Sequence, residues 1–113
     1  MLRASIPETG HPLDPRPIVS GAGCTGVPGG AELIAFTDAV VLGDVDEYDA
    51  ARATLAAVVG RAGADRAAMV AGNFSMMNRA LDAIGAPVDP GHDALAAEMG
   101  LSVPDHLRTH GPR

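Results

Sequence analysis

One seam of large apolar side chains constrains the fold of this chain more than any other feature of its sequence. The seam consists of Val70, Phe74, Met77, Leu81 and Ile84, which are spaced four, three, four and three residues apart. This spacing places all five on one face of a helix, whereas a strand would distribute them over both faces of a sheet. Asp65 and Arg66 fit a helix start, and Gly85, followed by Pro87, fits its end. We therefore predict a helix over 64–85 and expect neighbouring segments of the chain to cover the seam.

Two further helices are predicted before the seam helix. The first covers about 31–42 and ends at Gly43; its apolar stripe consists of Leu33, Phe36 and Val40, broadened by Ile34 and Val41. The second covers about 46–62, with Asp46 as its N-cap. Its expected buried face comprises Tyr48, Ala51, Leu55, Val58, Val59 and Ala62. The short link to the seam helix predicts an antiparallel helical hairpin.

The segments on either side of the three helices have a different character. Residues 1–30 hold eleven Gly and Pro, which predicts a disordered arm. A short helix over about 92–99 is expected to end at Gly100, and Leu101, Val103 and Leu107 to add a last turn. We thus expect an all-α chain of three to four helices, with a disordered arm over 1–30, a helical domain over 31–101 and a frayed tail over 102–113.

Composition favours self-association. The chain has 113 residues, enough for one domain, and 47% of them are apolar while only 3% are aromatic. A core of Ala, Val, Leu, Ile and Met gains little buried area per residue, and small domains bury only roughly 60% of their unfolded surface. We therefore expect a homo-oligomer, formed through the seam, to bury the apolar area that a monomer leaves exposed.

Charge and hydropathy exclude several other partners. The formal net charge is −6 and no basic patch occurs, which argues against a nucleic-acid partner. No apolar run approaches the roughly 18 residues of a membrane span, so no membrane association is expected. The first residues show no apolar stretch of the signal-peptide type, and we expect a cytoplasmic protein.

A glycine-rich hexad, Gly21-Ala22-Gly23-Cys24-Thr25-Gly26, matches the G-x-G-x-x-G pattern of dinucleotide-binding loops. Such a loop needs a strand before it and a helix directly after it. Only Ile18-Val19 could form the strand, and Pro28-Gly29-Gly30 occupies the place of the helix. We interpret the match as a chance feature of a Gly-rich arm and expect no bound cofactor.

Two groups of residues have the composition of metal sites. The first consists of Asp44, Asp46, Glu47 and Asp49. A calcium loop of the EF-hand type begun at Asp44 would need an oxygen ligand at position 48, Gly at position 49 and Glu at position 55, where the chain has Tyr, Asp and Leu. The second group, His106 and His110, has the spacing of a helical pair, but a Gly-Pro pair follows at once. We expect a solvated turn and surface histidines, and no metal site.

Cys24 is the single cysteine of the chain. One cysteine excludes an intrachain disulfide and a zinc site of the paired-cysteine type. No second cysteine can resolve a sulfenic acid, and we interpret Cys24 as an inert thiol.

The remaining candidates lie on or near the seam helix. The methionines Met69, Met76, Met77 and Met99 are interpreted as core or oligomer interface rather than as soft-metal ligands. For Asn73, Asn78 and Arg79 two interpretations stay open: hydrogen bonds to helix ends across an interface, or an exposed helix flank.

The run from Phe74 to Asp89, F-S-M-M-N-R-A-L-D-A-I-G-A-P-V-D, resembles the closing helix of the carboxymuconolactone decarboxylase and alkylhydroperoxidase D-like family. The shared pattern is an Asn-Arg pair, an apolar-Asp-Ala stretch and Gly-x-Pro. The two upstream helices are similar to those that precede it in the family, so that the likeness covers about 31–101. It implies an all-helical fold and homo-oligomers.

The same resemblance implies a structural role for the residues that carry it. In peroxidase-type members the chemistry comes from a Cys-x-x-Cys pair with a nearby Glu and His, and this sequence has no such pair. The catalytic residues therefore stay unassigned, and Asn78, Arg79, Gly85 and Pro87 are taken as structural.

The abrupt change at Gly30 from Gly/Pro-rich to periodic sequence suggests that the chain is the C-terminal half of a longer ancestral protein. The upstream DNA tests this hypothesis. If no reading frame there encodes a Cys-x-x-Cys helix, the truncation idea fails.

Three functions are compatible with these features. The leading hypothesis is an oligomerising helical module of the family, without catalytic machinery of its own. The second is an enzyme, either a thiol peroxidase-like protein that uses Cys24 or a carbon-acid enzyme with His92 or Asp65 as general base. The third is a small helical partner that docks on another protein.

Overall fold

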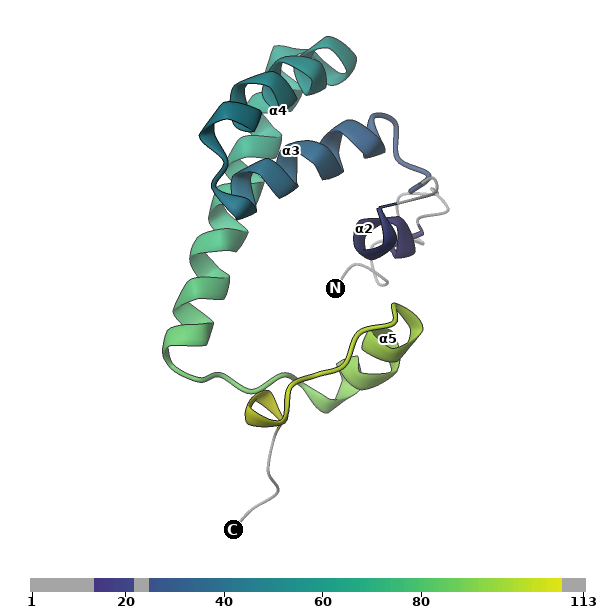
Figure 1. Ribbon diagram of the computed structural model, residues 1–113, viewed down its shortest axis with the longest axis vertical. Helices are drawn as coiled ribbons and strands as arrows, with labels where there is room; N and C mark the ends of the chain where they lie inside the picture. Colours follow the sequence, from purple (N-terminus) through teal and green to yellow (C-terminus); the bar gives the residue numbers. More distant parts are fainter. Residues whose placement is uncertain (1–13, 22–24, 109–113) are drawn as a thin grey trace. The chain divides into compact units, whose positions relative to one another are not determined.

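The computed structural model of the chain describes residues 14–21 and 25–108 (Figure 1). Its α-helices are α2 (Arg16–Ser20), α3 (Gly30–Leu42), α4 (Val45–Ala83) and α5 (Asp93–Glu98), and two 3₁₀ turns, η1 (Pro90–His92) and η2 (Asp105–Leu107), follow the long helix and α5. Within these described ranges no strand occurs, and the β-type pairing there is one isolated bridge between Val88 and Arg108. The predicted all-α class is confirmed.

The long segment α4 is a hairpin of two helical arms, as the sequence predicts. Gly60 interrupts it with φ 78° and ψ 163°, a backbone conformation that side chains with a Cβ essentially never adopt. The arms are therefore Val45–Val59 and Arg61–Ala83, drawn in teal and green in Figure 1. The seam helix begins a turn earlier than predicted, because Gly60 alone makes the reversal and Asp65 lies inside the second arm.

The turn between α3 and α4 is built by Gly43 and Asp44. Gly43 takes the left-handed conformation, and its N–H donates to the Ala39 carbonyl, which ends α3 as predicted. The Asp44 carboxylate then accepts from the N–H groups of Asp46 and Glu47, both at 3.1 Å. The expectation of Asp46 as N-cap is wrong: the reversal at Gly43 already presents Asp44 to the unpaired N–H groups of the next helix.

The core of the hairpin region centres on three fully buried residues, Phe36 of α3, Leu55 of the first arm and Ala64 of the second. Around them pack Leu33, Val40, Tyr48, Ala51, Ala56, Val59, Ala67 and Ala68. The Phe36 and Tyr48 rings lie 5.4 Å apart between centroids, at an interplanar angle of 44°. Of the predicted buried face of the first arm, Val58 and Ala62 are exposed, because Leu55 and Val59 already occupy the contact with α3 and the second arm.

Within residues 14–21 and 25–108, no neighbouring segment covers the seam, contrary to the expectation. Its exposed fractions are 57% for Val70, 55% for Phe74, 46% for Met77, 46% for Leu81 and 78% for Ile84. The second arm turns an alanine face inward instead, with Ala64 and Ala71 buried and Ala67 and Ala68 half-buried. At about 100° per residue this face lies roughly 120° around the helix from the seam. Small side chains let the arm approach Leu55 more closely than the seam could.

The two arms of α4 differ in length. The second arm is longer than the first by about eight residues, or about 12 Å of helix. The last turns of the second arm therefore have no part of the first arm opposite them. The chain divides into two compact units, Met1–Phe74 and Ser75–Arg113.

The second unit begins with the end of α4. Ala86 N–H donates to the Leu81 carbonyl and Gly85 N–H to that of Asp82, the pair of bonds of a Schellman motif, which confirms Gly85 as the helix end. The motif repeats at the end of α5, with Leu101 N–H on Ala96 and Gly100 in the left-handed conformation. Residues 102–108, assigned to the tail from the sequence, include the turn η2.

The part of the predicted disordered arm that the structure describes contains α2, which the sequence reasoning missed. Asp14 and the Pro15-Arg16-Pro17 run start this helix, and Gly21 ends it with its N–H on the Pro17 carbonyl. Pro early in a helix and Gly just after it are the signals that could have revealed it. The prediction for residues 1–13 lies outside the described residues.

We expect replacement of Gly60 by Ala to lower the free energy of unfolding by about 1–3 kcal/mol, because Ala must adopt a strained φ and ψ or shift the hairpin. Urea denaturation monitored by circular dichroism measures the loss.

Gly72 provides the matched control on the same helix. It is helical, and a Cβ built on it meets nothing within 4 Å. Gly72→Ala should raise the stability by up to about 1 kcal/mol. A Gly60→Ala variant as stable as the original chain would contradict the assigned hairpin bend.

Candidate functional site

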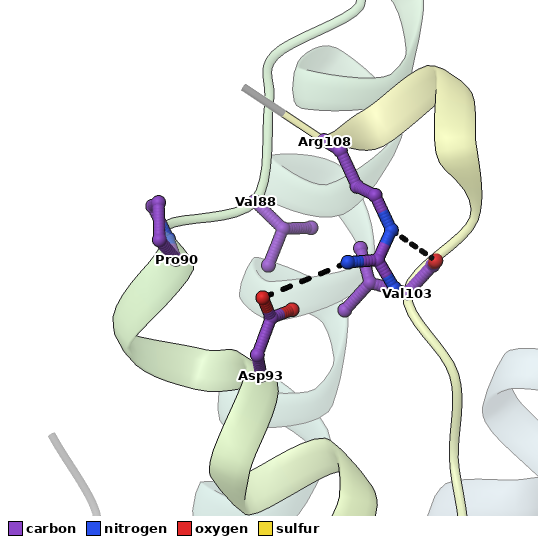
Figure 2. A pocket seen from close by; sticks show the side chains of 5 residues that line it. All are labelled: Val88, Pro90, Asp93, Val103 and Arg108. Carbon is purple, nitrogen blue, oxygen red and sulfur yellow. Dashed lines mark hydrogen bonds and ion pairs between the residues drawn. The ribbon is translucent and has the colours of Figure 1, made fainter. Parts of the chain in front are cut away.

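The second unit contains a small hollow beside Arg108. It has a volume of about 170 Å³ and is lined by Val88, Pro90, Asp93, Val103 and Arg108. Figure 2 shows the Arg108 side chain reaching toward Asp93, with Val88 and Val103 beside it. Val88 N–H donates to the Leu107 carbonyl at 2.7 Å, which ties the chain after α4 to the end of η2 and forms one wall of the hollow.

Arg108 holds this wall in place through three oxygen acceptors. Its Nε donates to the Val103 carbonyl at 3.2 Å and lies 3.5 Å from the Asp105 carboxylate. Its Nη1 lies 3.7 Å from Asp93 Oδ2, an ion pair that Figure 2 shows as a dashed line. Because the charged groups of the hollow are paired with each other, the arrangement fastens the C-terminal segment rather than presenting a reactive group. In the sequence, the only indication of these Arg108 contacts is the three-residue spacing of Asp105 and Arg108, which allows an ion pair within one turn.

A second ion pair joins the two arms of α4. Arg52 Nη2 of the first arm donates to Asp65 Oδ1 of the second. Both side chains are partly exposed, so the pair contributes less to stability than to the alignment of the arms. Asp65, a candidate general base from the sequence, is thus engaged in a structural contact.

The structure does not assemble the other candidate residues into one site. His92, the alternative general base, is exposed in η1 of the second unit, whereas Asp65 belongs to the first. Asp44 of the acidic group is the helix cap described above, and Asp46, Glu47 and Asp49 are exposed. Within the described residues no group of three or more His, Cys, Asp or Glu is placed to hold a metal ion.

The glycine-rich hexad follows a helix rather than a strand. Gly21 ends α2, and Thr25 lies so close to Gly30 that a Cβ on Gly30 would meet its hydroxyl at 2.0 Å. A side chain at Gly30 would therefore displace Thr25, which gives this glycine at the first position of α3 a structural explanation. Residues 22–24 of the hexad, including Cys24, lie outside the described residues, as does His110.

Among the described groups, the Asp14 carboxyl has a pKa that is clearly lowered. It accepts from Arg16 Nε at 2.9 Å, from Nη2 at 2.8 Å and from the Arg16 backbone N–H at 3.0 Å. These hydrogen bonds, the side-chain ones first, hold the pKa of Asp14 below its ordinary value of 3.8. The carboxylate thus ties the backbone before α2 to the first residue of the helix, which is a local structural role.

The polar candidates on the seam helix are exposed. Asn73, Asn78 and Arg79 all face solvent in the single chain, and so do Met69 and Met76, with exposed fractions of 74% and 64%. Met99 of the second unit is half-buried. The exposed surface of α4 thus carries two methionines in addition to the apolar seam.

No family model, curated protein or solved structure matches this chain. None of the described helices is both long enough and apolar enough to cross a membrane.

We expect Arg108→Gln to weaken the fastening of the C-terminal segment by about 1 kcal/mol, because it removes the charged donor to Val103 and Asp93. The Val88 amide, which donates to Leu107, should then exchange with solvent deuterium roughly fivefold faster. Arg79→Gln, on the exposed surface of α4, is the control. Equal exchange rates in the two variants would contradict the role of Arg108.

The Asp14 carboxyl should titrate with a midpoint below 3.8, as followed by the NMR shift of its carboxyl carbon. A lowered pKa means that the stabilisation from the contact between Asp14 and Arg16 is fully present above the ordinary pKa and is lost as pH falls through the lowered one. Arg16→Gln should move the midpoint only part of the way back, because the backbone N–H at position 16 still donates. An unchanged midpoint in this variant would rule out the side-chain contribution.

Proposed function

We propose that this chain is a helical module that associates with copies of itself through the seam of Val70, Phe74, Met77, Leu81 and Ile84, without catalytic machinery of its own. The observation that carries the proposal is the exposure of this seam. Every one of its side chains is at least 46% exposed in the single chain, although their spacing is that of a buried helix face. Contiguous exposed apolar surface of this kind marks interaction sites in folded proteins.

The hairpin geometry supports the same proposal. The first arm begins at Val45, which by its distance from Gly60 lies opposite roughly residue 75 of the second arm. The alanine face takes the contact with Leu55 and Phe36. The chain therefore contributes no segment of the hairpin that could cover the last turns of α4. A second chain can supply the missing contact without an entropic cost for ordering the helix backbone, since the helix is already formed before binding.

The resemblance to the carboxymuconolactone decarboxylase and alkylhydroperoxidase D-like family supports the proposal as an analogy. It rests on Asn78-Arg79, Gly85 and Pro87, and the family is expected to form homo-oligomers. Gly85 acts here as the helix end, which agrees with a structural role for that part of the pattern. The cytoplasmic location expected from the sequence belongs to the same proposal.

Static light scattering tests the proposal. The original chain should form a dimer or larger assembly at micromolar concentration, and the double variant Phe74→Asp, Leu81→Asp should be monomeric, since a charge on each seam cannot be buried without a partner. Because both positions are exposed in the single chain, the variant should keep its helix content by circular dichroism.

The matched control places the same two charges on another exposed apolar surface. Val41 and Leu42, at the end of α3, have exposed fractions of 58% and 78%. Val41→Asp, Leu42→Asp should leave the assembly intact. A monomeric original chain, or equal loss of assembly in both double variants, would overturn the proposal.

A further inference from the structure

We infer that the partner on the seam is the same helix of a second copy, running antiparallel, with Met77 of each copy at the two-fold axis. This inference rests on the proposed self-association and adds the orientation and the register of the two helices. It comes from the symmetry of the seam, from the charges at its ends and from the uncharged stretch between them.

The seam is nearly symmetric about its centre. Val70 and Ile84 each lie seven residues from Met77, whereas Phe74 lies three residues before it and Leu81 four residues after it, a mismatch of one residue. In an antiparallel pair centred on Met77, Val70 meets Ile84 of the other copy, and Phe74 meets Leu81. Each branched aliphatic side chain then lies against another, and the aromatic ring lies against Leu rather than against its own copy. This is the self-complementary contact that a two-fold axis requires, at the 3.5-residue spacing of paired helices.

The charges at the ends of the seam distinguish the two orientations. Arg66 lies roughly 40° around the helix from the seam at about 100° per residue, close enough to border the contact. A parallel pair would place two Arg66 side chains beside each other. An antiparallel pair places each Arg66 near the C-terminal end of the other α4, whose last turn contains no basic residue. The partial negative charge of that helix end attracts a cation, so the antiparallel orientation is the complementary one.

Around its centre the contact is free of charge, and Arg79 and Asp82 lie roughly 180° and 120° around the helix from the seam. Residues 67–78 include no Asp, Glu, Lys or Arg, so the net charge of −6 carried by each copy does not oppose the approach along this stretch. Asn78 follows Met77 and is exposed in the single chain. In the antiparallel register the two Asn78 carboxamides lie on the same side of the pair near the axis, where each can donate to and accept from the other.

The size of the seam suits a dimer. Its five side chains expose on the order of 500 Å² per copy, so a pair buries about 1,000 Å² before flanking residues are added, close to the roughly 1,200 Å² of small specific interfaces.

Site-directed cross-linking tests the register. In a chain with Cys24 replaced by Ser, single cysteines are introduced as Val70→Cys, Met77→Cys or Ile84→Cys and treated with a short bismaleimide. Met77→Cys should cross-link to itself, and Val70→Cys should not, because the two positions 70 then lie about 21 Å apart along the axis. A mixture of Val70→Cys with a mass-tagged Ile84→Cys chain should give the mixed cross-linked dimer. Ala57→Cys, exposed on the first arm, is the control for random collision.

Each outcome separates this inference from the proposed function. An assembly by light scattering in which Val70→Cys cross-links to itself would overturn the antiparallel register and leave association through the seam intact. An assembly in which no seam cysteine cross-links more than Ala57→Cys would overturn both. A chain that is monomeric at all concentrations would overturn the proposed function and, with it, this inference.

Discussion

The close approach of the second arm of α4 to Leu55 and Phe36 is the contact on which the first unit depends. Ala64 permits it, because a methyl side chain lets the helix backbone come near a larger neighbour. Gly60 makes it geometrically possible by reversing the chain within one residue. The same contact turns the second arm so that its alanine face points inward and its bulky seam points to solvent. One packing constraint thus explains both the buried core and the exposed apolar surface.

The second unit is held by polar contacts more than by a core. Its described part contains no fully buried large side chain, and the bonds between Val88 and Leu107 and around Arg108 close it. Such contacts are individually modest in water. They nevertheless position Pro90, α5 and η2 after the Schellman turn at Gly85, where the sequence shows little hydrophobic periodicity.

The charged side chains of the described residues serve mainly to shape the backbone. Asp44 and Asp14 accept from free helix N–H groups, Arg52 pairs with Asp65 across the hairpin, and Arg108 fastens the C-terminal segment. A carboxylate engaged in this way is not poised as a general base, since its lone pairs already accept hydrogen bonds. Asp65, a candidate general base from the sequence, therefore has a structural explanation, whereas the exposed apolar surface of α4 has none within the described chain.

The sequence by itself determined α3, the two arms of α4 and α5, the glycines that end α3 and α4, and the grouping of five apolar side chains on one helix face. These features follow from backbone propensities and a local period. Only the tertiary structure decided which face of the seam helix is buried, which aspartate caps α4 and where Arg108 reaches. Burial depends on how near two helices can come and on the unequal lengths of the arms, and both are properties of pairs of distant segments. Periodicity identifies the residues that share a face, but the size of the side chains at the crossing decides whether that face is the one turned inward.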